Sequence, residues 1–139
     1  MRKIIFNSLL IFLFTIGSFA QENINQVSAK GERIGVWEKH YKNQRIRYQG
    51  RFENGKEVGV FKYYSAASSE FPIVIKTFDK NSSEAFVQYF TLKGLSESEG
   101  NMNGKKRIGK WNYYHKDGTT QMLEENYIDG VLNGNFKIF

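Results

Sequence analysis

The sequence predicts an all-β protein in which consecutive antiparallel β-hairpins form an elongated, twisted, single-layer repeat sheet behind a signal peptide. Two observations lead to this prediction: large aromatic residues recur every 25 residues, and Gly-containing turns separate short segments rich in strand-forming residues. The composition agrees, because the 139 residues include 13 Gly, 12 Phe and 8 Tyr but only one Pro. Aromatic residues favour strands, and Gly favours turns.

The first 20 residues have the composition of a secretory signal peptide. Arg2 and Lys3 form a basic start, residues 4–16 are mostly Ile, Leu and Phe, and residues 18–20 read Ser-Phe-Ala. The apolar stretch is shorter than the roughly 20 residues that a membrane span needs. We therefore expect cleavage after residue 20 and a periplasmic or secreted protein. An uncleaved membrane anchor is the alternative.

The rest of the chain divides into a polar segment, residues 21–30, expected to be a linker, and a β-hairpin repeat domain, residues 31–139. The chain contains no Cys, so neither a disulfide nor a Cys-linked lipid anchor can form. Its formal charge of +6 falls to +4, from 18 basic and 14 acidic residues, once Arg2 and Lys3 are removed. This surplus permits acidic partners without requiring them.

Three ladders of residues define the repeat. In the first ladder, aromatic residues recur at 25-residue intervals from position 61, and a further ring at position 37 stands one residue short of the series. A second ladder of rings lies three residues after the first. In the third ladder, a Gly stands two residues before each ring of the first ladder, except in the third copy, where Glu84 replaces it. We expect rings to stack between hairpins and each Gly to leave space for a neighbouring ring. The predicted structural core is Gly35, Trp37, Tyr41, Gly59, Phe61, Tyr64, Phe86, Tyr89, Gly109, Trp111, Tyr114, Gly134, Phe136 and Phe139.

Turn sequences lie between the residues of these ladders. Asn54-Gly55, Asn103-Gly104 and Asp129-Gly130 are strong signals for hairpin turns of type I′, because both central residues of that turn need a positive φ. Further turns are expected at 31–35, 42–44, 65–69 and 117–118. The strand-forming segments between them are residues 36–41, 45–52, 60–64, 73–78 and 86–92.

The pattern Gly-x-Trp/Phe-x-x-Tyr with Asx-Gly resembles the repeats of MORN-type proteins (membrane occupation and recognition nexus). Residues 103–111 are the closest local match and residues 54–61 the next, and the likeness covers residues 31–139. In particular, the chain resembles bacterial MORN-variant proteins labelled YwqK-family antitoxins of toxin–antitoxin systems. The resemblance implies an elongated sheet of consecutive hairpins and a role in binding or scaffolding.

We expect neither catalytic residues nor a metal site, and no cofactor. His40 and His115 are the only His residues, and neither has a nucleophile motif or a partner acid at a diagnostic spacing. Both are interpreted as strand-face residues. Two His without any Cys also argue against a zinc site.

The neighbouring carboxylates are interpreted as solvated strand or turn charges, because acid–base chemistry needs a cleft between the two acids. They form two pairs, Glu97 with Glu99 and Glu124 with Glu125. The alternative is a small enzyme in which Glu84, His115 or a neighbouring acid converge in a pocket.

Basic residues form two candidate contact regions for anionic lipid, glycan or another polymer. The first region is a predicted strand with Arg45, Arg47 and Arg51. The second region is a predicted turn with Lys105, Lys106 and Arg107. A solvated turn is the simpler interpretation of the second region. Nucleic acid is not an expected partner, because the chain is predicted to be exported and its charge is modest.

Together these features predict a non-enzymatic exported protein that acts as an interaction or scaffold module in the cell envelope, with a protein or envelope component as its partner. One alternative is a binder of membrane surfaces or anionic polymers through basic repeat faces. Another is an antitoxin-like protein that binds a protein partner. The unpaired strand expected at Phe139 makes edge-strand self-association a further option.

Overall fold

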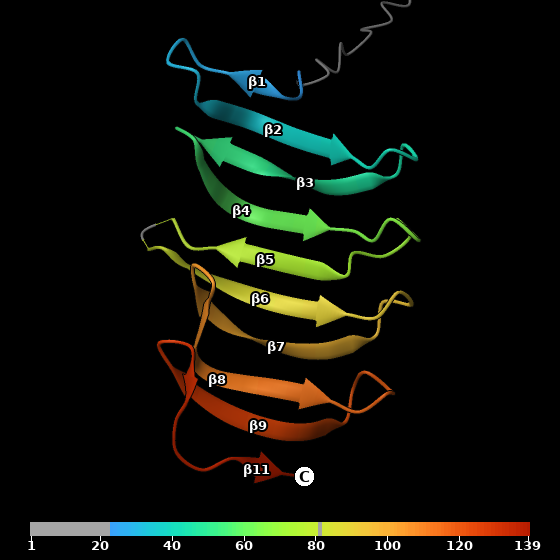
Figure 1. The fold of residues 1–139 in the computed structure, drawn as a ribbon, viewed down its shortest axis with the longest axis vertical. Helices are drawn as coiled ribbons and strands as arrows, with labels where there is room; N and C mark the ends of the chain where they lie inside the picture. Colours follow the sequence, from blue (N-terminus) through green and yellow to red (C-terminus); the bar gives the residue numbers. More distant parts are fainter. Residues whose placement is uncertain (1–22, 81) are drawn as a thin grey trace, which may run out of the picture.

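The computed structural model describes residues 23–80 and 82–139, so the expected signal peptide lies outside the described residues. The described chain forms one open sheet of 11 strands, in which consecutive strands pair in antiparallel fashion from β1 to β10 (Figure 1). β11 pairs with β9. No helix occurs within this part of the chain. The predicted all-β class and the consecutive antiparallel strands are therefore confirmed.

The strands are short, as the spacing of the turns requires. They are β1 (Gln26–Val27), β2 (Arg33–His40), β3 (Ile46–Glu53), β4 (Lys56–Tyr63), β5 (Val74–Phe78), β6 (Glu84–Phe90), β7 (Ser96–Asn103), β8 (Lys106–Tyr114), β9 (Gln121–Ile128), β10 (Val131–Leu132) and β11 (Lys137–Ile138). β1 lies within the segment expected to be a linker, and it pairs with β2. The carbonyl oxygen of Gln26 accepts a hydrogen bond from Nε1 of Trp37 at 3.0 Å.

Successive turns lie alternately at the two ends of the strands (Figure 1). At 54–55 and 129–130 both central residues have positive φ, with values of 48°, 76°, 51° and 85°, as the type I′ prediction requires. The third predicted turn differs: Asn103 pairs with Lys106, so the two-residue loop is Gly104-Lys105, and only Gly104 (φ 60°) has a positive φ. That pattern is typical of a type II′ turn.

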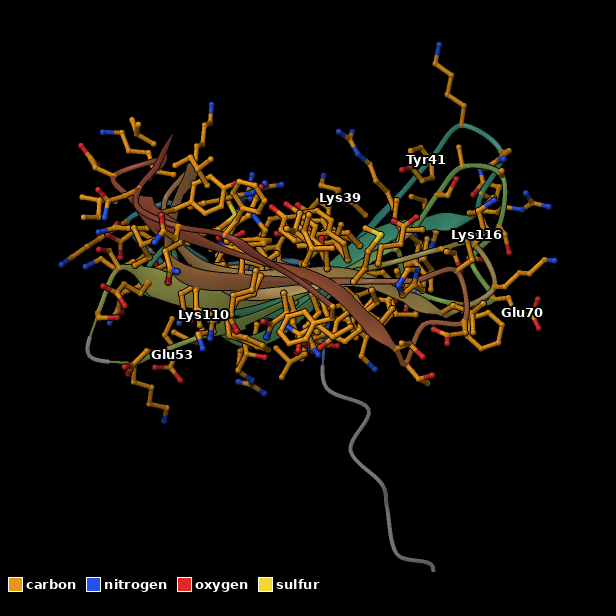
Figure 2. All side chains as sticks on the ribbon, turned by 90° about the horizontal axis from the view of Figure 1, so that it is seen from below. Lys39, Tyr41, Glu53, Glu70, Lys110 and Lys116 are labelled. Atoms are coloured by element: carbon orange, nitrogen blue, oxygen red, sulfur yellow. The ribbon has the colours of Figure 1, made fainter. Side chains whose placement is uncertain are left out.

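Side chains leave the sheet on two faces. The core face carries Trp37, Phe61, Val87 and Trp111, all of which are buried. The other, called the opposite face here, carries the residues that alternate with them, among them Val60 and Phe86. Figure 2 shows the labelled Lys39 and Lys110 on different sides of the sheet.

The buried ring series differs from the predicted one at the third copy. Phe86 is 39% exposed on the opposite face, whereas Val87 is fully buried in a cluster with Ala85 and Trp111. A regular 25-residue period between Phe61 and Trp111 predicts a buried ring at position 86. The fully buried residue is instead Val87, one position later. Because adjacent strand residues point to opposite faces, a shift of one residue turns Phe86 outward.

At the C-terminal end the predicted ladders also leave the core. Phe136 and Phe139 are 56% and 62% exposed. β11 comprises two residues and pairs with β9 only at Lys137–Glu124 and Ile138–Leu123. So short a strand buries little apolar area, and these two rings are not core residues in the structure.

The glycine ladder has a different role from the one expected. Gly59 and Gly109 have positive φ (65° and 63°), and no atom lies within 4 Å of where their Cβ would be. They lie where the pairing of β4 with β3 and of β8 with β7 shifts register, which is typical of bulges that need a positive φ. The space for the rings comes from Gly50 and Gly100, where a Cβ would approach the Phe61 and Trp111 rings to 2.5 Å.

Candidate binding surfaces

The core face has no second layer of secondary structure among the described residues, and long cationic side chains cover its rings instead. The Cζ atom of Arg107 lies 4.5 Å from the centroid of the Trp111 ring. Arg33 lies 4.9 Å from that of Trp37, and Nζ of Lys76 lies 5.4 Å from that of Tyr63. Such contacts combine cation–π attraction with burial of the aliphatic stem. They help to explain how Trp111 reaches 0% exposure in a single-layer sheet.

A hydrogen-bond network surrounds Arg107 at the C-terminal end of this face. Its Nη1 donates to the hydroxyl oxygens of Tyr113 at 2.8 Å and Tyr127 at 3.3 Å. The Tyr127 hydroxyl in turn donates to Oε2 of Glu125 at 2.7 Å. Burial, and hydrogen bonds to Tyr127 and Glu125, raise the pKa of Tyr113 far above its ordinary value. The network thus holds one cation, Arg107, and one carboxylate, Glu125, on the core face.

On the opposite face, Glu99 of β7 is held by two neighbours. Its Oε1 accepts a hydrogen bond of 2.6 Å from the Tyr114 hydroxyl, and its Oε2 accepts one of 3.1 Å from Nε2 of Gln88. The bond to Glu99, together with burial, raises the pKa of Tyr114 to about 12. At the equivalent positions, in β3 and just after β4, the Tyr64 hydroxyl accepts a bond of 3.3 Å from Nε2 of Gln49.

A shallow hollow of about 260 Å³ opens on the opposite face over β3 and β4. Val36 and Val60 supply apolar atoms, and polar and cationic groups surround them. The full lining is Val36, Gln49, Gly50, Arg51, Val60 and Lys62. Such a lining suits an anionic group that also has an apolar part.

Charge divides the opposite face into two halves. Strands β3 and β4 bear three cations and one acid there, namely Arg51, Lys56, Lys62 and Glu53. Strands β6 and β7 contain no Lys or Arg and bear Glu84 and Glu99 on this face. The uncharged residues Ile75 and Thr77 of β5 lie between the two halves.

The structure does not gather the predicted basic contacts into one patch. Arg51 lies on the opposite face, and Cζ of Arg47 lies 5.8 Å from the centroid of the Tyr41 ring, whereas Arg107 lies on the core face among tyrosines. Arg45 donates hydrogen bonds to the backbone carbonyls of residues 66 and 67 in the next loop. Lys105 is an exposed turn residue, and Nζ of Lys106 lies 2.8 Å from Oδ1 of Asp129 in an exposed ion pair.

The predicted His and carboxylate candidates are also dispersed. Nε2 of His40 lies 3.0 Å from Oε1 of Glu38, while His115 is an exposed residue just after β8. Glu84 begins β6 and His115 follows the end of β8, so the two residues lie at opposite ends of the strands (Figure 1). In β9, Glu124 points to the opposite face and Glu125 to the core face. No group of three or more His, Asp or Glu residues within 23–80 and 82–139 could hold a metal ion.

Comparison with known proteins identifies no relative: no family model, curated protein or solved structure matches the chain. Among the described residues there is also no helix with the length and apolarity needed to span a membrane. The surfaces described above are therefore the basis for proposing a function.

Sequence reasoning missed the Arg107 network and the hollow over β3 and β4. A signal for both existed at twice the repeat period. Gly50 and Gly100 stand two periods apart, as do Tyr63 and Tyr113, and in each case the two residues hold equivalent register positions. Comparing residues that stand two periods apart would have distinguished the positions that face the buried rings from the positions next to them in sequence.

Proposed function

We propose that this protein is a non-enzymatic, exported interaction or scaffold module whose sheet binds a protein or another component of the cell envelope. The single observation that carries the proposal is the open single-layer sheet, since no other secondary structure covers either face within the described residues. An uncovered sheet offers a broad, continuous surface for a partner. The proposed export rests on the signal-like composition of residues 1–20.

We also propose that the sheet is a MORN-like repeat array whose unit spans two periods and comprises two hairpins. Support comes from the register: Trp37 pairs with Gly50 in β2–β3, and Val87 pairs with Gly100 in β6–β7. Pairing shifts recur in the β3–β4 and β7–β8 pairs. Binding of a protein partner is also what the resemblance to YwqK-family antitoxins implies.

For the partner we favour the core face. Half-buried tyrosines and cations such as Lys39 and Lys76 share this face, and Tyr and cationic groups combine apolar contact with hydrogen bonding at interfaces. The half-buried tyrosines are Tyr48, Tyr63, Tyr89, Tyr113 and Tyr127. An acidic protein surface would complement them.

Affinity capture from envelope extract tests this function. Three baits are compared: the natural protein, a core-face variant (Lys39→Glu with Lys76→Glu), and a variant with the same charge change in exposed turns (Lys93→Glu with Lys116→Glu). We expect one component to be enriched by the natural protein and by the turn variant but not by the core-face variant. Enrichment of no component, or equal enrichment by all three baits, would contradict the proposal.

A second candidate function is binding of a membrane surface or an anionic polymer. The cationic half of the opposite face, with Arg51, Lys56 and Lys62, favours it. Liposome co-sedimentation at increasing salt separates it from the first function, because contacts between exposed charges weaken with ionic strength. Salt-independent or absent binding would exclude it.

A further inference from the structure

The hollow over β3 and β4 on the opposite face places two cations beside an apolar wall. Arg51 and Lys62 both line it. They lie diagonally across the two strands, because Lys62 pairs with Gln49, which stands two residues before Arg51. Diagonal neighbours in a sheet have Cα atoms roughly 7–8 Å apart, a distance that long side chains bridge. Both cations can therefore approach one anionic group in the hollow.

No acid lines this hollow within the described part of the chain. The cross-strand partners of the two cations are uncharged: Gln49 and Ile75 for Lys62, and Val36 and Val58 for Arg51. Strands β2 and β3 each bear one acid on this face. Of these, Glu38 lies beside His40, and Glu53 pairs with Lys56 at the end of the strand. An anion in the hollow would therefore meet attraction from the lining and no repulsion from it.

The fold does not require this pair of cations. Two periods later, Asn101 stands at the position equivalent to Arg51, and Asn112 stands at that equivalent to Lys62. The third equivalent residue, Glu99, is an acid where the hollow has Gln49. The same register forms in that half of the sheet with no cation at these positions. Arg51 and Lys62 thus distinguish the hollow from its structural equivalent, as a ligand site would.

An apolar track, consisting of Val60, Thr77 and Phe86, leads away from the hollow along the same face. Val60 lines the hollow and pairs with Thr77, and Thr77 pairs with Phe86. Val60 is 50% exposed and Phe86 is 39% exposed. Two strand spacings of about 4.8 Å place Phe86 about 10 Å from Val60. The face therefore combines a cationic end with an apolar path of limited length.

We propose that the hollow binds an anionic amphiphile, a molecule in which one anionic oxygen group is joined to an alkyl chain. The anionic oxygens lie between Arg51 and Lys62, which donate charge-assisted hydrogen bonds. The alkyl chain lies along the apolar track, where it covers exposed apolar area. This site goes beyond the proposed function, which concerns the core face. It also differs from the second candidate function, because one bounded site carries the binding and the overall charge does not.

Isothermal titration calorimetry tests the proposal on protein produced from the full chain, with octanoate below its micelle-forming concentration as the probe. The natural protein is expected to bind octanoate at a single site. Butyrate should bind at least about tenfold more weakly, because each buried methylene tightens binding by up to about fourfold. Octanol, which has the same chain without the charge, should also bind at least about tenfold more weakly. A Kd for octanoate above about 1 mM, or equal binding of octanol, would overturn the proposal.

Substitutions in the hollow locate the site. Arg51→Gln and Lys62→Gln should each weaken octanoate binding by at least about fivefold, since each removes a hydrogen bond to a charged group. Lys56→Gln is the matched control, because it removes a cation from the same half of the face but outside the hollow. It should change the affinity by less than about twofold. Equal losses in all three variants, or none in the hollow variants, would contradict the proposed site.

The apolar track has a test of its own. Phe86→Ser should weaken octanoate binding by at least about threefold and leave butyrate binding unchanged, because only the longer chain reaches position 86. Circular dichroism checks that each variant retains its β-sheet. Equal effects of Phe86→Ser on the two probes, or no effect on octanoate, would show that the chain does not follow the track and would overturn that assignment.

Vesicles distinguish a membrane lipid from a free amphiphile as the source of the ligand. Co-sedimentation compares vesicles of phosphatidylglycerol and phosphatidylcholine with vesicles of phosphatidylcholine alone. If the site takes a lipid headgroup, Lys62→Gln should lose binding to the anionic vesicles and Lys56→Gln should keep it. Octanoate binding that depends on Lys62, without vesicle binding, supports a free amphiphile in the same hollow. Equal loss of vesicle binding in both variants, with octanoate binding changed in neither, would overturn the site.

Discussion

Replacing Gly100 with Ala should lower the free energy of unfolding by about 1–3 kcal/mol, because the added methyl group has no space. The new Cβ would lie 2.5 Å from Cδ2 and 2.6 Å from Cγ of Trp111. Relaxed carbon–carbon contacts are about 3.5–4.0 Å, so the ring would have to move by about 1 Å. Trp111 is fully buried, and its Nε1 donates a 3.0 Å hydrogen bond to the carbonyl oxygen of Asn101. Movement would disturb both its packing and that bond.

An opposing effect exists but is smaller. Ala restricts the unfolded chain more than Gly does, which stabilises by about 0.4–1 kcal/mol where the native conformation suits it. We expect the clash to exceed this gain. Urea titration and thermal melting measure the difference, and a domain of this size should lose about 4 °C in Tm per kcal/mol.

Two further variants show whether the clash is the cause. Asn101→Ala, at the exposed neighbour, should change stability by less than about 0.5 kcal/mol. In Gly100→Ala with Trp111→Leu, the smaller side chain leaves room for the methyl group, so the two substitutions should cost less together than the sum of their separate effects. An unchanged melting curve for Gly100→Ala, or strict additivity with Trp111→Leu, would refute the reasoning.

Three other predictions use the same structure. Val87→Ala should cost about 2 kcal/mol and Phe86→Ala less than about 1 kcal/mol in urea titration, because only Val87 is buried; the reverse order would place Phe86 in the core. Spectrophotometric titration should give Tyr114 a pKa of about 12, and Glu99→Gln should move that pKa toward 10. Because folding raises this pKa, the associated stability is complete below pH 10 and is lost as the pH rises through about 12; a Tyr114 pKa unaffected by Glu99→Gln would contradict it. NMR should give the exposed Asp117 carboxyl a pKa of about 2, because a hydroxyl and two backbone N–H groups of the same turn donate to it. Folding lowers this pKa, so its contribution is present above the ordinary value and is lost as the pH falls through about 2; titration near 3.8 would show that these bonds are absent in solution.

Turn chemistry and strand propensity explain why much of the fold could be predicted. The expected segment 73–78 begins one residue before β5, and the expected segment 45–52 is offset by one residue at both ends from β3. The Asx-Gly turns at 54–55 and 129–130 were also located correctly, because the positive φ that they need is a local property of those residues. The candidate surfaces were harder to foresee, since Arg107 and Arg51 belong to different faces although both read as basic strand or turn residues.

The sequence by itself determined that the described chain forms consecutive antiparallel strands, because residue types and turn signals act over a few neighbouring positions. Only the tertiary structure decided which face each residue occupies. A bulge shifts the register, and a shift of one residue exchanges the two faces. The bulge at Gly109 leaves Gly100 to make room for Trp111, whereas regular pairing of Phe61 with Lys76, and of Lys76 with Val87, puts Val87 rather than Phe86 on the core face. Those choices depend on pairing between strands, which no local pattern specifies.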